Sequence, residues 1–147
     1  MLTCHDVANY FLARARADDD AGEAISNLKM QKLVYYAQGA ALAIFDKPLF
    51  AEPIEAWTHG PVVPVLYQRF KAFGSGPIEF DEQVDLAKYD KETREILDEV
   101  YDFFGQYSGW KLRNMTHQEP PWIETPSGSV ISHSGMQRYF KTIVETE

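Results

Sequence analysis

The sequence predicts a mainly α (α+β) fold: a single compact domain of about six helices around a central helix, with two or three short strands. The chain has 147 residues, which is an ordinary size for one domain. Hydrophobic residues make up 45% and charged residues 24%, a balance typical of globular proteins. Apolar residues recur at helical spacing between turn signals. Because no repeat or long linker interrupts residues 1–147, we expect one domain.

The first helix is expected over residues 4–16. Thr3 and Asp6 before it resemble a capping box, in which the Asp takes the position usual for Glu. Three adjacent aspartates and a glycine in residues 18–22 predict a solvated loop that ends this helix.

The second helix is the central one. Ser26 or Asn27 is a suitable N-cap, and the helix should reach Phe45 before the Asp-Lys-Pro at 46–48 stops it. Apolar residues form two separate stripes along it, and a helix that is apolar on two sides normally packs between other elements.

The middle of the chain predicts shorter elements. Residues 52–57 favour a short strand because Pro48 and Pro53 argue against a helix there. Gly60-Pro61 is expected to open a helix, with Pro64 tolerated in its first turn, that ends at residues 74–77. Weak alternation over residues 78–84 predicts another strand.

Three helices are expected in the last third of the chain. Asp90 can cap a helix that ends at Gly105, and Ser108 can start a short one. Pro120-Pro121 should force residues 116–122 to leave that helix. After a turn, Ser132 can cap the last helix.

Composition disfavours several classes of function. The chain carries 14 basic and 22 acidic residues, a net charge of -8, which argues against nucleic acid as a partner. The longest apolar stretch, residues 39–45, is too short to span a bilayer, so no membrane partner is expected. Cys4 is the only cysteine and forms no internal disulfide, which fits a cytoplasmic protein.

No residue pattern predicts catalysis. Cys4 and His5 are adjacent on a helix and point about 100° apart, so they do not form a nucleophile and base pair. His117 and Glu119 could serve as base and orienter in a small hydrolase or transferase, but no nucleophile accompanies them. The four histidines lack metal-site spacing, and no glycine-rich phosphate loop occurs. We therefore predict no enzyme, no metal and no cofactor.

The residues predicted to contact a partner lie on the central helix and after it. Lys29 and Lys32 are one turn apart, beside Tyr36, and form a protein-binding edge if that arc reaches the surface. The alternative is that the lysine stems cover the core while their ammonium groups stay in solvent. A ridge around His59 and Tyr67 is the second candidate surface.

Three stretches together carry a resemblance to a known family. Residues 26–39 contain a Leu-x-Lys-Leu-like helix core, residues 54–67 an Ala-Trp-x-x-Gly-Pro-Val turn, and residues 112–122 a Thr-His followed by Pro-Trp. In order and spacing they resemble the Panacea domain of the SocA-like, phage-associated antitoxins, over nearly the whole chain. The motif residues to which the resemblance gives a structural role are Leu33, Tyr35, Trp57, Gly60, Pro61, Val62, Pro64, His117 and Trp122.

The resemblance implies a function by binding. Members of this family act as antitoxins, typically encoded beside a toxin gene, which implies neutralisation of a cognate protein toxin by direct complex formation. Delivery of the toxin to a AAA+ protease is a variant of that mechanism. Two alternatives remain open: the hydrolase or transferase that would use His117 and Glu119, and a phage-encoded regulator that contacts DNA, which the acidic charge disfavours.

Overall fold

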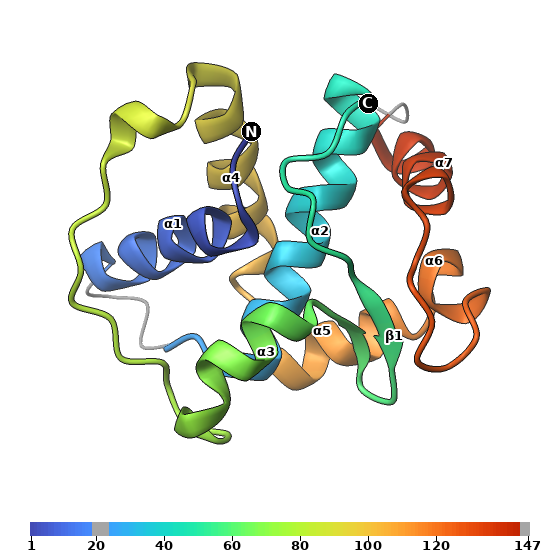
Figure 1. Cartoon of the computed structure of the whole chain (residues 1–147), viewed down its shortest axis with the longest axis horizontal. Helices are drawn as coiled ribbons and strands as arrows, with labels where there is room; N and C mark the ends of the chain where they lie inside the picture. The colour runs from blue at the N-terminus through green and yellow to red at the C-terminus, as the bar shows by residue number, and fades with distance from the viewer. Residues whose placement is uncertain (19–23, 145–147) are drawn as a thin grey trace.

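A computed structural model describes residues 1–18 and 24–144 of the chain. Within these ranges the fold is mainly helical, with seven α-helices and one antiparallel sheet of two strands (Figure 1). The mainly α (α+β) prediction is therefore confirmed. No helix within the described ranges is long and apolar enough to cross a membrane.

The elements follow one another with short connections. The helices are α1 Cys4–Ala17, α2 Asn27–Phe45, α3 Pro64–Phe70, α4 Lys91–Phe104, α5 Gly109–Thr116, α6 Pro120–Ile123 and α7 His133–Val144. The strands are β1 Glu55–Trp57 and β2 Gly60–Val62. Two single turns of 3₁₀ helix, η1 Lys71–Phe73 and η2 Leu86–Lys88, flank the extended segment between α3 and α4.

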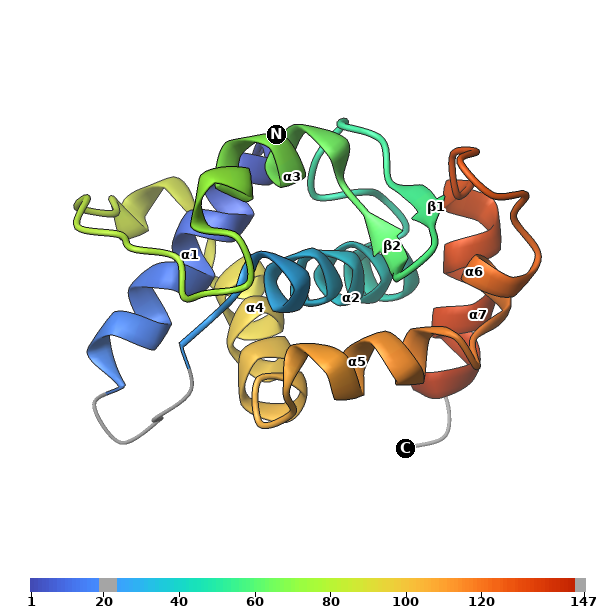
Figure 2. The same ribbon diagram turned by 90° about the horizontal axis from the view of Figure 1, so that it is seen from below.

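Helix α2 lies at the centre of the fold, as predicted. Figures 1 and 2 show it surrounded by the other elements, and it packs against α1, α3, α4, α5, α7 and β2. The Ser26 hydroxyl caps its start by accepting a hydrogen bond of 3.2 Å from the Lys29 amide. Asp46 ends it in the left-handed conformation, at φ 58°.

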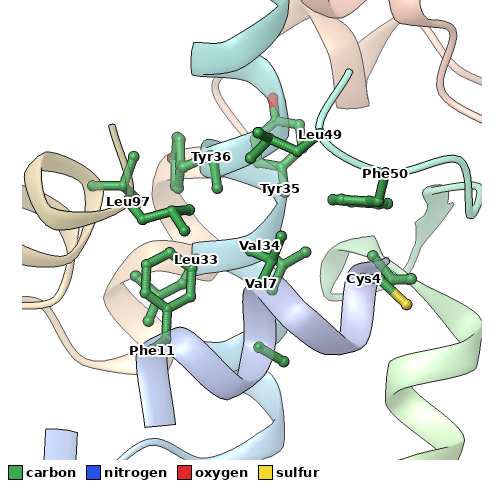
Figure 3. Close-up of a cluster of buried hydrophobic side chains, with 14 of the residues drawn as sticks. Cys4, Val7, Phe11, Leu33, Val34, Tyr35, Tyr36, Leu49, Phe50 and Leu97 are labelled. Atoms are coloured by element: carbon green, nitrogen blue, oxygen red, sulfur yellow. The ribbon is translucent and has the colours of Figure 1, made fainter. Parts of the chain in front are cut away.

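The apolar core forms between α2 and its neighbours. Figure 3 shows Val7 and Phe11 of α1 facing Leu33 and Val34 of α2, with Leu97 of α4 beside them. All five side chains are buried. Burial of this kind is the main stabilising contribution in a domain of this size, at roughly 25 cal/mol for each Å² of apolar surface removed from water.

The predicted helix caps are confirmed. Thr3 and Asp6 make both hydrogen bonds of the capping box before α1. The side chains of Asp90 and Ser108 accept from backbone amides at the starts of α4 and α5. Ser132 Oγ accepts a 3.0 Å hydrogen bond from the Gly135 amide at the start of α7. These local signals involve residues three apart and need no distant partner, which is why sequence alone predicts them.

Three predictions of local structure are wrong. Residues 60–62, expected to open a helix, form β2, which pairs with β1, and α3 begins only at Pro64. Residues 78–84 form no strand because no second strand lies beside them; their neighbour Pro77 makes only an isolated bridge to Ser26. The chain leaves α5 at Thr116 as expected, but no further helix was predicted there, whereas Pro120-Pro121 open α6, at positions where the missing N–H costs nothing. The acidic loop expected at 18–22 lies mostly outside the described residues.

Candidate partner-binding site

Polar side chains of the central helix α2 make hydrogen bonds to the β1–β2 hairpin and to the residue that follows it. Trp57 pairs with Gly60 across the turn, so Thr58 and His59 form its tip. Lys32 Nζ donates a hydrogen bond of 2.9 Å to the Pro61 carbonyl. Gln31 Oε1 accepts one of 2.9 Å from the amide of Val63, just beyond the strand. The polar side chains of α2 therefore fix the strand that carries the Gly-Pro motif.

The Thr-His and Pro-Trp motif holds the same hairpin from its other side. Trp122 Nε1 donates a 2.8 Å hydrogen bond to the Trp57 carbonyl. The His117 ring stacks on Trp122 with centroids 3.9 Å apart and hydrogen bonds to the backbone of Thr58. Burial and the nearby Arg113 lower the pKa of His117, which favours the neutral ring. Motifs far apart in the sequence thus meet at one turn.

Gly60 is required where these elements meet. Its φ is +107°, a conformation that other residues rarely adopt. A Cβ at this position would lie 2.7 Å from Thr116 Oγ1 and 2.9 Å from Lys32 Cε. Any side chain at position 60 would therefore push the hairpin away from α2 and α5.

The other motif residues are packed around this junction. Leu33, Tyr35, Pro61 and Val62 are buried, whereas Trp57, Pro64, His117 and Trp122 are half-buried. None of these side chains has the exposure typical of a residue that reaches out to a partner. Apart from Trp57 and Val62, which also line a surface hollow beside the hairpin, these residues support a surface rather than form it.

The predicted protein-binding edge on α2 is wrong. The exposed fractions of Lys29, Lys32 and Tyr36 are 3%, 0% and 1%, so neither the edge nor the solvated ammonium groups exist. Lys29 Nζ donates to the Gly105 carbonyl at 2.7 Å, and the Tyr36 ring stacks on Phe104 with centroids 3.8 Å apart. Because other elements surround this part of α2, its charged side chains do not reach solvent.

Lys32 is a buried cation with an altered proton affinity. Burial lowers its pKa from 10.5 to about 7, and the positive charge of Arg113 adds to this effect. No carboxylate of the described residues pairs with it. The ammonium is held by a backbone carbonyl alone, which stabilises a charge less than an ion pair would.

Sequence reasoning missed a buried carboxylate centre one helical turn beyond Lys32 along α2. Tyr35 donates to Glu119 Oε1 at 3.0 Å and Tyr36 donates to Oε2 at 2.7 Å. Tyr139 of α7 donates to the same carboxylate. Burial raises the pKa of Glu119 from 4.5 to about 7, although the tyrosine hydrogen bonds act in the opposite direction. The signal in the sequence was the adjacent Tyr35-Tyr36 pair, which alone does not identify its acceptor.

The structure gives no support to chemistry at the residues considered for catalysis. The Glu119 oxygens accept hydrogen bonds from tyrosine hydroxyls. The described part of the chain forms two large surface hollows, and neither is lined by His117 or Glu119. Cys4 is buried, and this burial raises the pKa of its thiol to about 12, while His5 Nδ1 lies 3.3 Å from Arg69 Nη1. Over the described ranges no three His, Cys, Asp or Glu side chains gather as metal ligands do.

His59 and Tyr67 do line an open surface hollow of about 600 Å³, which we call the hairpin hollow. Trp57 and Lys71 are also part of its wall. The Trp57 and Tyr67 rings meet edge to face with centroids 5.1 Å apart. The fold thus brings together the two surface residues that the sequence singled out.

Helix α5 adds a rim that sequence reasoning did not identify. The Arg113 guanidinium lies over the Trp110 ring, 4.7 Å from its centroid, and Arg113 Nε donates to His59 Nδ1 at 3.4 Å. Trp110 is 54% exposed, and its ring centroid is 5.6 Å from that of His59. A tryptophan followed by Lys111 and Arg113 was the available signal, but only the packing of α5 beside the hairpin brings it to His59.

The family described as "Antitoxin SocA-like, Panacea domain" matches residues 30–123, which is more than half of the chain. The chain belongs to this family. The resemblance expected from the three sequence stretches is therefore confirmed. The matched stretch runs from α2 to α6 and so includes the hairpin and the elements on both sides that hold it. Helices α1 and α7 of this Panacea protein lie outside the matched stretch.

One curated relative of this Panacea domain is Antitoxin SocA of Caulobacter vibrioides (strain NA1000 / CB15N), with 47% identity over 68 residues. The aligned part covers 46% of this chain, and the chain spans only 35% of the length of that relative. No solved structure matches the chain at a significant level. The assignment to the Panacea family thus depends on sequence similarity.

Proposed function

We propose that this chain is an antitoxin that neutralises a protein toxin by direct binding in the cytoplasm. The observation that carries the proposal is the family match over residues 30–123. The curated relative is itself named an antitoxin, which supports the same role. In this proposal residues 1–147 act as one Panacea domain, and the toxin is the product of an adjacent gene.

The proposed mechanism is masking rather than chemistry. The side chains considered for catalysis are engaged in packing, whereas His59 and Tyr67 lie on an open hollow beside exposed aromatic surface. His59 lies on a hairpin that Lys32, Gln31 and Trp122 anchor, and Tyr67 lies on α3, so little order has to be gained on binding. Such preorganised surfaces suit tight complexes without a cofactor.

The experiment is co-expression with the adjacent gene. The product of that gene should arrest growth when expressed alone, and this chain should restore growth and co-purify with it in a defined ratio. A harmless product, or one that stays equally toxic when this chain is present, would contradict the proposal.

Delivery of the toxin to a AAA+ protease is the variant mechanism, and toxin half-life separates it from masking. If masking acts alone, the toxin persists in cells that express this chain and its activity returns when the complex is dissociated. If delivery also acts, the toxin half-life shortens only when both this chain and the protease are present.

A further inference from the structure

The hairpin hollow differs in charge from the rest of the molecule. The chain contains 22 acidic residues and has a net charge of -8, yet no aspartate or glutamate lines this hollow. A second hollow of about 750 Å³, which we call the N-terminal hollow, is lined by Asp6, Asp90 and Glu92 together with Lys47 and Lys88. Basic and apolar residues therefore gather on one surface of an acidic protein.

The basic side chains at the hairpin also lack acidic partners. Elsewhere Arg14, Lys88 and Lys141 each pair with an aspartate. Over the described ranges, no carboxylate lies within 4.0 Å of the basic groups of His59, Lys71 or Arg113. The charge of Arg113 lowers the pKa values of the nearby His117 and Lys32. Glu55, on β1, is the acidic residue nearest to His59 in the sequence, and its carboxylate accepts a hydrogen bond of 2.9 Å from Trp57 Nε1.

Aromatic surface accompanies this uncompensated charge. Trp110 is 54% exposed beneath the Arg113 guanidinium, and the edge-to-face pair of Trp57 and Tyr67 forms the wall of the hollow. Tryptophan, tyrosine and arginine are the residues most enriched among those that dominate binding energy at protein interfaces. A cluster with this composition, contributed by the hairpin, α3 and α5, is suited to recognise a partner segment that is itself acidic and partly apolar.

We propose that the hairpin hollow and its rim form the toxin-contacting surface and receive an acidic segment of the toxin. An apolar side chain of that segment enters the hollow and packs against the paired rings of Trp57 and Tyr67, and a carboxylate approaches Arg113 and His59. This inference depends on the proposed antitoxin function and adds to it the chemistry of the partner. A protein segment is favoured over nucleic acid because the net charge of -8 repels a polyanion at long range, while a short acidic segment meets only the local positive surface.

The experiment measures the affinity of the chain for the protein encoded by the adjacent gene, at low and at high salt. Lys71→Glu reverses an exposed charge of the hairpin hollow, and Arg113→Gln removes the cation of its rim. Lys47→Glu is the matched control because Lys47 is an exposed lysine that lines the N-terminal hollow. Circular dichroism melting checks that all three variants fold like the unchanged chain.

Each of the two hairpin variants should weaken binding by about tenfold or more, and the control by less than about twofold. The affinity of the unchanged chain should fall with salt, and that of Lys71→Glu should fall less. If Lys71→Glu and Arg113→Gln bind as tightly as Lys47→Glu, the inference is overturned while the antitoxin function stands. If the unchanged chain forms no complex, both fail.

Nucleic acid is the competing partner class and has its own assay. Short single-stranded DNA and its duplex are mixed with the unchanged chain and with Arg113→Gln at physiological salt. Absence of a retarded band is the expected result. A band that the unchanged chain produces and Arg113→Gln does not would overturn the inference in favour of a nucleic acid surface.

Discussion

Lys32 and Glu119 are buried against neighbouring turns of α2, and their environments differ in what compensates the charge. Glu119 accepts hydrogen bonds from tyrosine hydroxyls, whereas Lys32 donates to one carbonyl and lies near the positive charge of Arg113. Each has a pKa of about 7, reached from opposite directions. The difference separates an internal packing centre at Glu119 from a charge beneath an open surface at Lys32.

Removal of the Glu119 carboxylate should have the largest effect on stability. Glu119→Leu leaves the hydroxyls of Tyr35 and Tyr36 buried without their acceptor, so the free energy of unfolding should fall by about 4 kcal/mol. Denaturant titration at neutral pH measures it. A loss under about 1 kcal/mol would mean that the hydroxyls find other acceptors, and the contrast with Lys32 would disappear.

Gly60 lies against Lys32, and Gly60→Ala should lower the free energy of unfolding by about 3 kcal/mol. The substitution combines backbone strain with contacts to Thr116 and Lys32 that are too close. Gly128→Ala is the matched control: its φ is +83°, yet nothing lies within 4 Å of the added Cβ. Thermal unfolding of both variants separates the two contributions. Equal losses would show that strain alone accounts for the effect at position 60.

The pH dependence at Lys32 follows from its lowered pKa. Between pH 7 and 10.5 the unfolded chain holds the Lys32 proton and the folded chain does not, so stability due to this group rises with pH. Relative to Lys32→Met, the unchanged chain should gain about 2 kcal/mol in unfolding free energy from pH 7 to pH 9. A constant difference would show that Lys32 stays charged in the folded state.

Glu119 should give the opposite slope in a lower range. Between pH 4.5 and 7 the folded chain holds the Glu119 proton and the unfolded chain does not, so stability due to this group falls as pH rises. Relative to Glu119→Gln, the unchanged chain should lose about 1.5 kcal/mol between pH 5 and pH 6.5. If instead it gains stability over this range, the tyrosine hydrogen bonds outweigh burial.

The smallest expected effect tests how the Glu119 centre shares its donors. Tyr139→Phe removes one donor and leaves Tyr35 and Tyr36 in place, so stability should fall by about 1 kcal/mol. Tyr107→Phe is the control, because no hydrogen bond from the Tyr107 hydroxyl occurs within the described part of the chain. If both variants lose the same amount, the third hydroxyl contributes nothing specific to Glu119.

Particular residues show how far sequence reasoning reached. The caps at Thr3, Ser26, Asp90 and Ser108 were predicted because a cap is a hydrogen bond between neighbours in the chain. The hairpin at Gly60 was missed because its alternative, a proline-started helix, is equally permitted locally. Only pairing with β1 and hydrogen bonds from α2 decide between the two.

The candidate site divides in the same way. His59 and Tyr67 were predicted to form an exposed ridge, and they line the hairpin hollow. Arg113 and Trp110 were missed because nothing within α5 indicates that it lies beside the hairpin. Lys29 and Lys32 were placed at the surface because lysine usually lies there, whereas the structure buries both against backbone carbonyls.

The sequence by itself determined the helical class, the central position of α2, most helix starts and the membership of the Panacea family, because these depend on local periodicity, capping and motif order. Only the tertiary structure decided which polar side chains of α2 are buried, which acceptor Tyr35 and Tyr36 share, and that α5 completes the rim at His59. These features join residues from distant parts of the chain, and the burial that gives them their charge properties exists only once the helices have packed.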